Sequence, residues 1–181
     1  MLNNLEEIEK EYNLKSSEEW YNLEEGDNKC RIVSDALVLA KHYNPETKES
    51  FVCYGKENGC PYCAKEDKPR IKFLCYVIDR SDSTIKIASF GYSIIKAIKK
   101  FKDGEEYGFK DLPPYDMTIN KTKTGSRKVD VEYTVMAGRN NIDITEEEKE
   151  KIDKLKPIEG IIETMKAKQI EKDGIKESSN D

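Results

Sequence analysis

The sequence predicts a mainly β protein, in which a small antiparallel barrel carries an inserted subdomain and a C-terminal helical segment. Three observations lead to this prediction. Seven short runs of alternating or β-branched residues, about five of them expected to form the barrel, are separated by turn residues, a single helical pattern interrupts them midway, and no pattern of parallel crossovers is present. With 181 residues, of which 36% are hydrophobic, the chain can bury one main core.

The expected strands are bounded by turn residues and by changes in hydrophobic alternation. In chain order they are residues 29–33, 36–40, 50–54, 71–80, 84–90, 115–119 and 129–135. Ser34 and Asp35 form a bend between the first two strands. Residues 71–80 are apolar on both faces, which is typical of a central strand, and they pair with 84–90 in a hairpin. The last two strands form a second hairpin with a basic tip at 121–128.

Helices are expected at three places. Residues 1–24 form an acidic helical arm, and residues 92–101 repeat isoleucines at helical spacing. Thr145 begins a helix through the Thr-x-x-Glu pattern of a capping box, and a break is expected near Pro157 and Gly160. The expected organisation is an arm at 1–24, a barrel core at 25–140, a helical segment at 141–172 and a disordered tail at 173–181.

The only histidine and three of the five cysteines lie within 22 positions. His42, Cys53, Cys60 and Cys63 are the donor set of a structural zinc site, and the Cys-x-x-Cys spacing lets two thiolates grip one ion from a tight turn. Four protein ligands leave no open position for water, which argues against a catalytic metal. We therefore expect one structural Zn²⁺ in a subdomain inserted at about 42–69.

The cysteines allow other interpretations. Cys60 and Cys63 can instead be a redox pair or buried thiols unrelated to His42, but no βαβ pattern surrounds them. Cys30 and Cys75 lie inside apolar stretches, so they are expected to be core thiols.

The net charge of −5 is unevenly distributed. Residues 70–139 carry 14 basic and 9 acidic groups, whereas both flanking regions are net acidic. The basic centre leaves room for a polyanionic ligand. The first residues lack an apolar leader pattern, and no run of apolar residues is long enough to cross a membrane, so we expect an intracellular protein that is not secreted.

Short antiparallel strands with one helix midway make the oligonucleotide/oligosaccharide-binding (OB) barrel the leading candidate. In its order of features, the chain resembles the single-stranded DNA-binding, helix-destabilising proteins of T-even and related bacteriophages. The resemblance covers roughly residues 20–137. It is carried by the Arg31-Ile32 strand, the four zinc ligands with Pro61 and Tyr62, the hairpin 71–79/84–90, the helix 91–98 and the hairpin 119–133 around Gly125.

This resemblance implies an OB-fold barrel with a zinc subdomain beside a cleft for single strands, and no enzymatic activity. It implies coating and protection of single-stranded DNA during replication, recombination and repair in the cytoplasm of the host cell. Two features depart from the family. Glutamates stand where the family has a basic N-terminal arm, and the long acidic tail is reduced to residues 171–181. The acidic arms are the expected contacts for replication or recombination proteins.

Sequence-independent binding of single strands needs cations for phosphates and aromatic faces for stacked bases. The residues expected to supply them are Arg31, Lys72, Tyr76, Arg80, Lys86, Tyr92, Tyr115, Lys121, Lys123, Arg127 and Tyr133. Tyr76 lies between Lys72 and Arg80 on one strand face and is the preferred stacking residue. For Tyr115 and Tyr133, packing in the core is the open alternative.

Two other classes of function were considered. A zinc-ribbon protein-interaction or transcription-accessory module is favoured by the acidic arms and the helical C-terminal segment. A metal-dependent nuclease is disfavoured, because His42 is already assigned as a ligand and no spaced carboxylate cluster is present.

Overall fold

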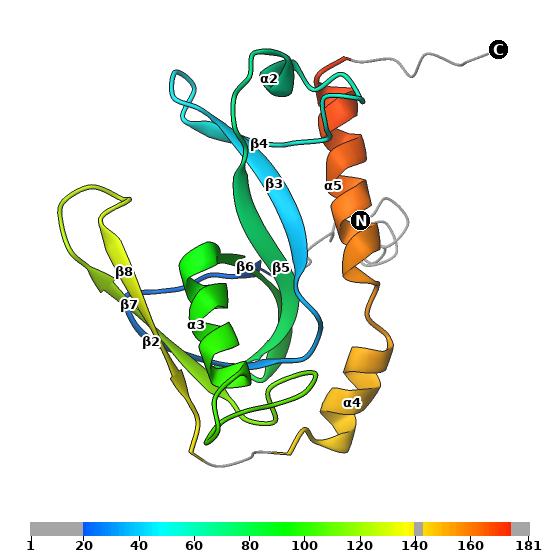
Figure 1. Ribbon diagram of the computed structural model, residues 1–181. Helices are drawn as coiled ribbons and strands as arrows, with labels where there is room; N and C mark the ends of the chain where they lie inside the picture. Colours follow the sequence, from blue (N-terminus) through cyan, green and yellow to red (C-terminus); the bar gives the residue numbers. More distant parts are fainter. Residues whose placement is uncertain (1–19, 140–142, 175–181) are drawn as a thin grey trace, which may run out of the picture.

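The computed structural model describes residues 20–139 and 143–174 (Figure 1). This part of the chain is mainly β, with eight strands in one sheet. The strands are β1 (Trp20–Tyr21), β2 (Gly26–Ile32), β3 (Leu37–Asn44), β4 (Glu49–Val52), β5 (Arg70–Asp79), β6 (Thr84–Gly91), β7 (Met117–Lys123) and β8 (Val131–Ala137). The helices are α2 (Pro61–Ala64), α3 (Tyr92–Lys102), α4 (Glu146–Asp153) and α5 (Ile158–Lys172).

The strands follow the order β1-β6-β5-β2-β7-β8, and every neighbouring pair except β1 with β6 is antiparallel. Beyond a bend at 33–36, β3 continues along the same edge of β5 that β2 occupies, and β4 folds back on β3. Within the described residues, β6 and β8 do not pair with each other. Figure 1 shows α3 lying in the space between them, where it packs against β8, β5 and β6. The sheet is curved around α3 without closing into a barrel.

The central strand β5 contributes side chains to two separate cores. Cys75 and Val77 point into the inner core under α3, which also contains Cys30 and Phe90. The alternate residues Leu74, Tyr76 and Ile78 belong to an outer core that α5 covers with Ile158, Ile161 and Ile162. The prediction of a central strand with two apolar faces is confirmed. Cys30 and Cys75 are core thiols, as expected, with exposed fractions of 0% and 1%.

The N-terminal end of the fold differs from the prediction. Trp20 and Tyr21 were expected to belong to a helical arm, but they form β1, which pairs in parallel with Ile87 and Ala88 of β6. Tyr21 is 7% exposed and packs in the inner core, and this burial favours the extended backbone. The remainder of the predicted arm, residues 1–19, lies outside the described residues.

The C-terminal helices begin and break as predicted. The Thr145 hydroxyl accepts a hydrogen bond from the Glu148 backbone N–H, and the Glu148 carboxylate accepts one from the Thr145 backbone N–H, which completes the capping box. Pro157 separates α4 from α5, whereas Gly160, also expected at the break, lies within α5 and does not interrupt it. Asp173 is the C-cap of α5, and of the predicted tail only Asp173 and Gly174 are described. None of the helices in the described ranges is both long and apolar enough to span a bilayer.

A buried ion-pair network joins α4 to the sheet. Asp116 is 2% exposed, and both of its carboxylate oxygens accept from Arg80 Nε at 3.1 Å. The same guanidinium donates from Nη1 to Glu148 Oε1 at 2.7 Å, and Arg31 Nη1 lies 3.8 Å from Asp116. Burial by itself would raise the pKa of Glu148, but hydrogen bonds within the capping box and the charge of Arg80 hold it below its usual value.

Replacing Asp116 by asparagine tests this network. Asp116→Asn leaves Arg80 and Arg31 with reduced compensation in a buried position, so we expect the free energy of unfolding to fall by about 3 kcal/mol. The matched control is Glu147→Gln, which removes an exposed ion pair with Lys151 and is expected to change stability by less than about 1 kcal/mol. Urea denaturation measures both. Equal stability of the two variants would contradict the role of the network.

Candidate metal centre and nucleic-acid interface

Four side chains from successive elements of residues 42–63 converge at one end of the sheet. His42 lies on β3, Cys53 directly follows β4, Cys60 is the N-cap of α2, and Cys63 lies within α2. A positive φ of 80° at Gly59 allows the chain to turn into Cys60, whose backbone N–H donates to the Gly55 carbonyl at 3.1 Å. The β3–β4 hairpin and this tight turn thus bring together the donors that the sequence predicted.

The geometry of the four donors suits a single metal ion. Their ligand atoms all lie within 4.8 Å of one another. Cys63 Sγ is 3.4 Å from Cys53 Sγ and 3.4 Å from His42 Nε2. These spacings are close to the edge lengths of a tetrahedron around an ion with metal–sulfur bonds of about 2.3 Å. The cluster can therefore hold a metal ion.

Groups outside the donor set fix the orientation of His42. Asp67 Oδ2 lies 2.7 Å from His42 Nδ1, which directs Nε2 toward the sulfurs. The ring of Tyr62 stacks on His42, with ring centroids 5.3 Å apart, and its other neighbour is the ring of Phe51 at 5.0 Å. Asp67 was not predicted from the sequence, because it is one of several acidic residues in a polar loop.

Ionisation of Cys63 is linked to the binding of a cation. Burial and hydrogen bonding with the neighbouring sulfurs raise the pKa of Cys63 to about 12, so this thiol resists ionisation by itself. A divalent cation reverses that preference by stabilising the thiolates, and its binding releases their protons.

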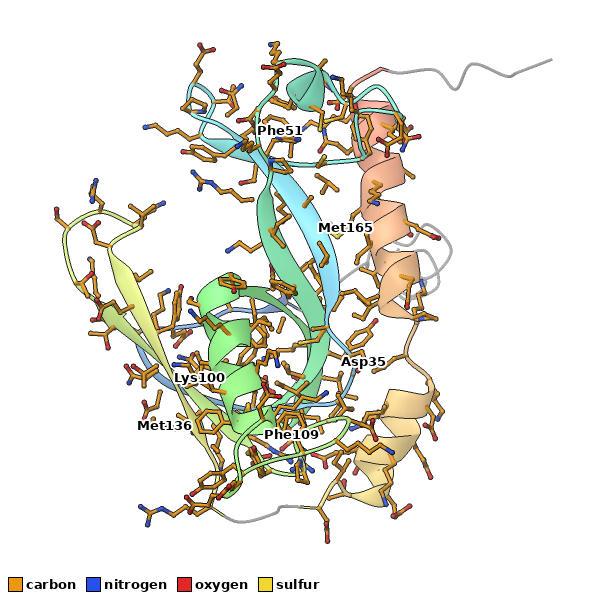
Figure 2. The ribbon with its side chains drawn as sticks, in the orientation of Figure 1. Asp35, Phe51, Lys100, Phe109, Met136 and Met165 are labelled. Atoms are coloured by element: carbon orange, nitrogen blue, oxygen red, sulfur yellow. The ribbon has the colours of Figure 1, made fainter. Side chains whose placement is uncertain are left out.

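The end of α5 packs against the cluster. The Tyr54 hydroxyl donates to Asp173 Oδ2 at 2.9 Å, and Ile170 packs on the small core made by Cys53, Tyr54 and Cys60. Lys172 Nζ lies 5.8 Å from the centre of the Phe51 ring. In Figure 2, Phe51 is labelled at this junction, beside the upper part of α5.

Several residues expected to touch nucleic acid are built into the fold instead. Tyr76 is 7% exposed because α5 covers its strand face, so its ring offers no open surface to a base and does not fit the expected stacking role. Tyr115 is 3% exposed, and its hydroxyl donates to the Tyr107 carbonyl at 2.6 Å. Tyr133 is half-buried against the inner core. Both tyrosines therefore pack in or against the core, which is the alternative to nucleic-acid contact.

Three of the expected cations are paired internally. Arg31 and Arg80 contact Asp116, as described above. Lys86 Nζ lies 2.8 Å from Asp79 and 2.6 Å from Asp82, and these hydrogen bonds raise its pKa. Alternation along one strand does not show which lysine or arginine forms an ion pair with a carboxylate that is distant in the sequence or across a turn. These contacts explain why the pattern overestimated the number of available cations.

Other expected residues lie on the surface. Tyr92 is 66% exposed at the first position of α3. At the β7–β8 tip, Lys123 is exposed, and Arg127 is also exposed, although its guanidinium pairs with Asp130 at 2.8 Å. Lys121 Nζ donates to the Leu23 carbonyl at 2.8 Å. Together with Lys128 these basic residues line one surface pocket.

A basic and aromatic cluster on β3 and β5 was only partly predicted. Lys41 and Arg70 are cross-strand partners, and Arg70 Cζ lies 5.0 Å from the centre of the Tyr43 ring. Lys72 lies two residues after Arg70 on β5 and points to the same face of the strand. Burial lowers the pKa of Lys41, and the charge of Lys72 lowers it further. The sequence contained a signal for this cluster, since Lys41 alternates with Tyr43 and Arg70 with Lys72 at the adjoining strand ends.

Searches with the chain find no matching family model, no matching curated protein and no matching solved structure.

Loss of one ligand tests the metal centre. Cys60→Ser is expected to abolish stoichiometric metal binding and to lower the thermal midpoint, because binding and local folding are coupled. Cys75→Ala is the control: it also removes a buried thiol, but one that lies in the inner core, so it should retain one metal per chain. Elemental analysis and thermal unfolding with and without a chelator measure the effect. Metal retained by Cys60→Ser would contradict the assignment.

The role of Asp67 is tested through metal affinity. Asp67→Asn weakens the interaction that orients His42, so we expect metal affinity to fall by about tenfold or more. Glu66→Gln is a neighbouring exposed control with no side-chain contact to the donors among the described residues. Competition with a chromophoric chelator gives both affinities. An unchanged affinity for Asp67→Asn would remove Asp67 from the metal centre.

Proposed function

We propose that this chain binds single-stranded nucleic acid, with single-stranded DNA as its ligand, largely without regard to sequence. The observation that carries the proposal is the strand order, together with the chemistry of two connections. If β2 and its continuation β3 count as the first strand, then β5, β6, β7 and β8 are the second to fifth. The order β6-β5-β2-β7-β8 then reads third, second, first, fourth and fifth, with α3 between the third and fourth.

This arrangement supports an OB fold with an open side. In OB folds the connection between strands one and two and the connection between strands four and five flank the oligonucleotide-binding face. In this chain the first connection carries the His/Cys cluster, and the second is the basic β7–β8 tip. Figure 1 shows both extending beyond the same end of α3, one on each side of it.

The charge on these two connections suits a phosphate backbone. The side chains of Lys123 and Lys128 make no ion pair or hydrogen bond with other described residues. The same holds for Lys41 on β3 and Lys72 on β5. Tyr43 and Tyr92 are exposed beside these cations, and bases can stack on exposed aromatic rings. Non-specific single-strand binding requires this combination of cations and aromatic faces.

The proposal includes Zn²⁺ as the ion in the His/Cys cluster. Three thiolates and one imidazole are a donor set that zinc prefers, and they fill a tetrahedral coordination shell. The ion would hold the connection between β3 and β5 in place, and the mechanism requires no chemical step at the metal. By the resemblance noted above, the proposed cellular role is to coat and protect single strands during DNA replication, recombination and repair.

A titration tests the function directly. The purified chain is titrated with an unstructured single-stranded oligonucleotide and with a matched duplex at two salt concentrations, and emission of Trp20 is followed. We expect tight quenching by the single strand, with affinity falling as salt rises. Equal affinity for duplex would contradict the proposal. No binding to either would favour the zinc-ribbon interaction module.

Removing the tip cations should reduce the number of phosphate contacts. For Lys123→Ala/Lys128→Ala we expect the slope of log affinity against log salt to become shallower by about 1.4, since each phosphate contact with a single strand contributes about 0.7. The control Lys154→Ala/Lys156→Ala makes the same change of charge between α4 and α5 and should leave the slope unchanged. Identical slopes for the two double variants would exclude the tip from the binding face.

A further inference from the structure

Three cations gather on neighbouring strands, and within residues 20–139 and 143–174 none of them forms an ion pair with a carboxylate. Lys41 of β3 stands across from Arg70 of β5, and Lys72 follows Arg70 by two positions on the same side of the strand. Among the described residues, neither Lys41 nor Lys72 has an ion-pair or hydrogen-bond partner for its ammonium group. Like charges held side by side repel, and a bound anion would relieve that repulsion.

The ammonium of Lys72 lies against the start of α3. Lys72 pairs with Gly91 across β5 and β6, and its Nζ is 3.8 Å from the position that a Cβ on Gly91 would occupy. Gly91 is also the N-cap of the 11-residue helix α3, which has neither a side-chain cap nor an acidic residue in its first turn. Backbone N–H groups in a first turn have no acceptor within the helix, so they are available to the same ligand as Lys72.

An exposed aromatic ring adjoins these donors. Tyr92 directly follows Gly91 and is 66% exposed. An exposed aromatic ring next to phosphate-binding groups suits a nucleotide, in which base and phosphate are joined through one sugar.

We propose that Lys41, Lys72 and the first turn of α3 bind one phosphate group of the single strand, and that Tyr92 stacks on the adjacent base. This inference rests on the proposed function and names the contacts within its binding face. The principal stacking residue is then Tyr92, at the junction of β6 and α3, in place of Tyr76.

The test compares substitutions of lysines at the two ends of α3. The probe is an oligothymidylate of about 12 nucleotides, a length within the range of sites on OB folds. Lys72→Ala should weaken binding by about threefold or more and make the salt slope shallower by about 0.7. Lys100→Ala makes the same change of charge in the later turns of α3, where Figure 2 labels Lys100, and should alter neither quantity.

The aromatic contact is tested separately. Tyr92→Ala should weaken binding by at least about fivefold, whereas Tyr92→Phe retains the ring and should bind like the wild type. Tyr92 is exposed and Lys72 is partly exposed, and thermal unfolding verifies that the variants at both positions are folded. Equal binding by Tyr92→Ala and the wild type would overturn the stacking contact.

A measurement on the wild type covers the case in which Lys72→Ala does not fold. Amide resonances of Tyr92 and Ser93 are followed by NMR as the oligothymidylate is added, and both should shift with the affinity found by fluorescence. Shifts confined to the β7–β8 tip would overturn the phosphate site while leaving the proposed function intact. No binding at all by the wild type would overturn the function and this site together.

Discussion

Burial of β5 on both faces is the constraint on which the rest of the structure depends. Its inner side chains fill the space under α3, and its outer side chains Leu74, Tyr76 and Ile78 require a second cover. The isoleucines at the start of α5 supply that cover. Each buried aliphatic or aromatic side chain contributes about 1.5 to 3 kcal/mol, so removal of α5 would expose a large apolar surface. The C-terminal helices are therefore part of the folded unit.

Covering β5 also determines which cations remain available. To bring α4 against the sheet, the fold buries Asp116 and Glu148 and neutralises them with Arg80 and Arg31. Lys86 pairs with Asp79 and Asp82 near the turn of the β5–β6 hairpin. Among the cations expected to contact nucleic acid, Lys72 of β5 and Lys123 of the β7–β8 tip have no such partner within the described residues.

A metal ion in the His/Cys cluster would stabilise a region that has little core of its own. Between β3 and β5, Cys53, Tyr54 and Cys60 form a small buried cluster, and two of these three are candidate metal donors. So small a core is a weak source of stability, which gives a bound metal a structural role there. Tyr54 and Phe51 then connect this region to the end of α5, so the cluster and the outer core share one helix.

The sequence by itself determined the local features. Alternation located the strands, the Thr145 capping box located α4, and the spacing of His42, Cys53, Cys60 and Cys63 located the metal donors, because each pattern depends on residues close together in the chain. The sequence did not predict the strand at Trp20 and Tyr21, because the pairing of these residues depends on the distant β6. Only the tertiary structure decided that Tyr76 is covered and Tyr92 exposed, and that Arg80 is paired while Lys72 is not. Burial and ion pairing are contacts between distant segments, and alternation in one segment carries no information about its partner.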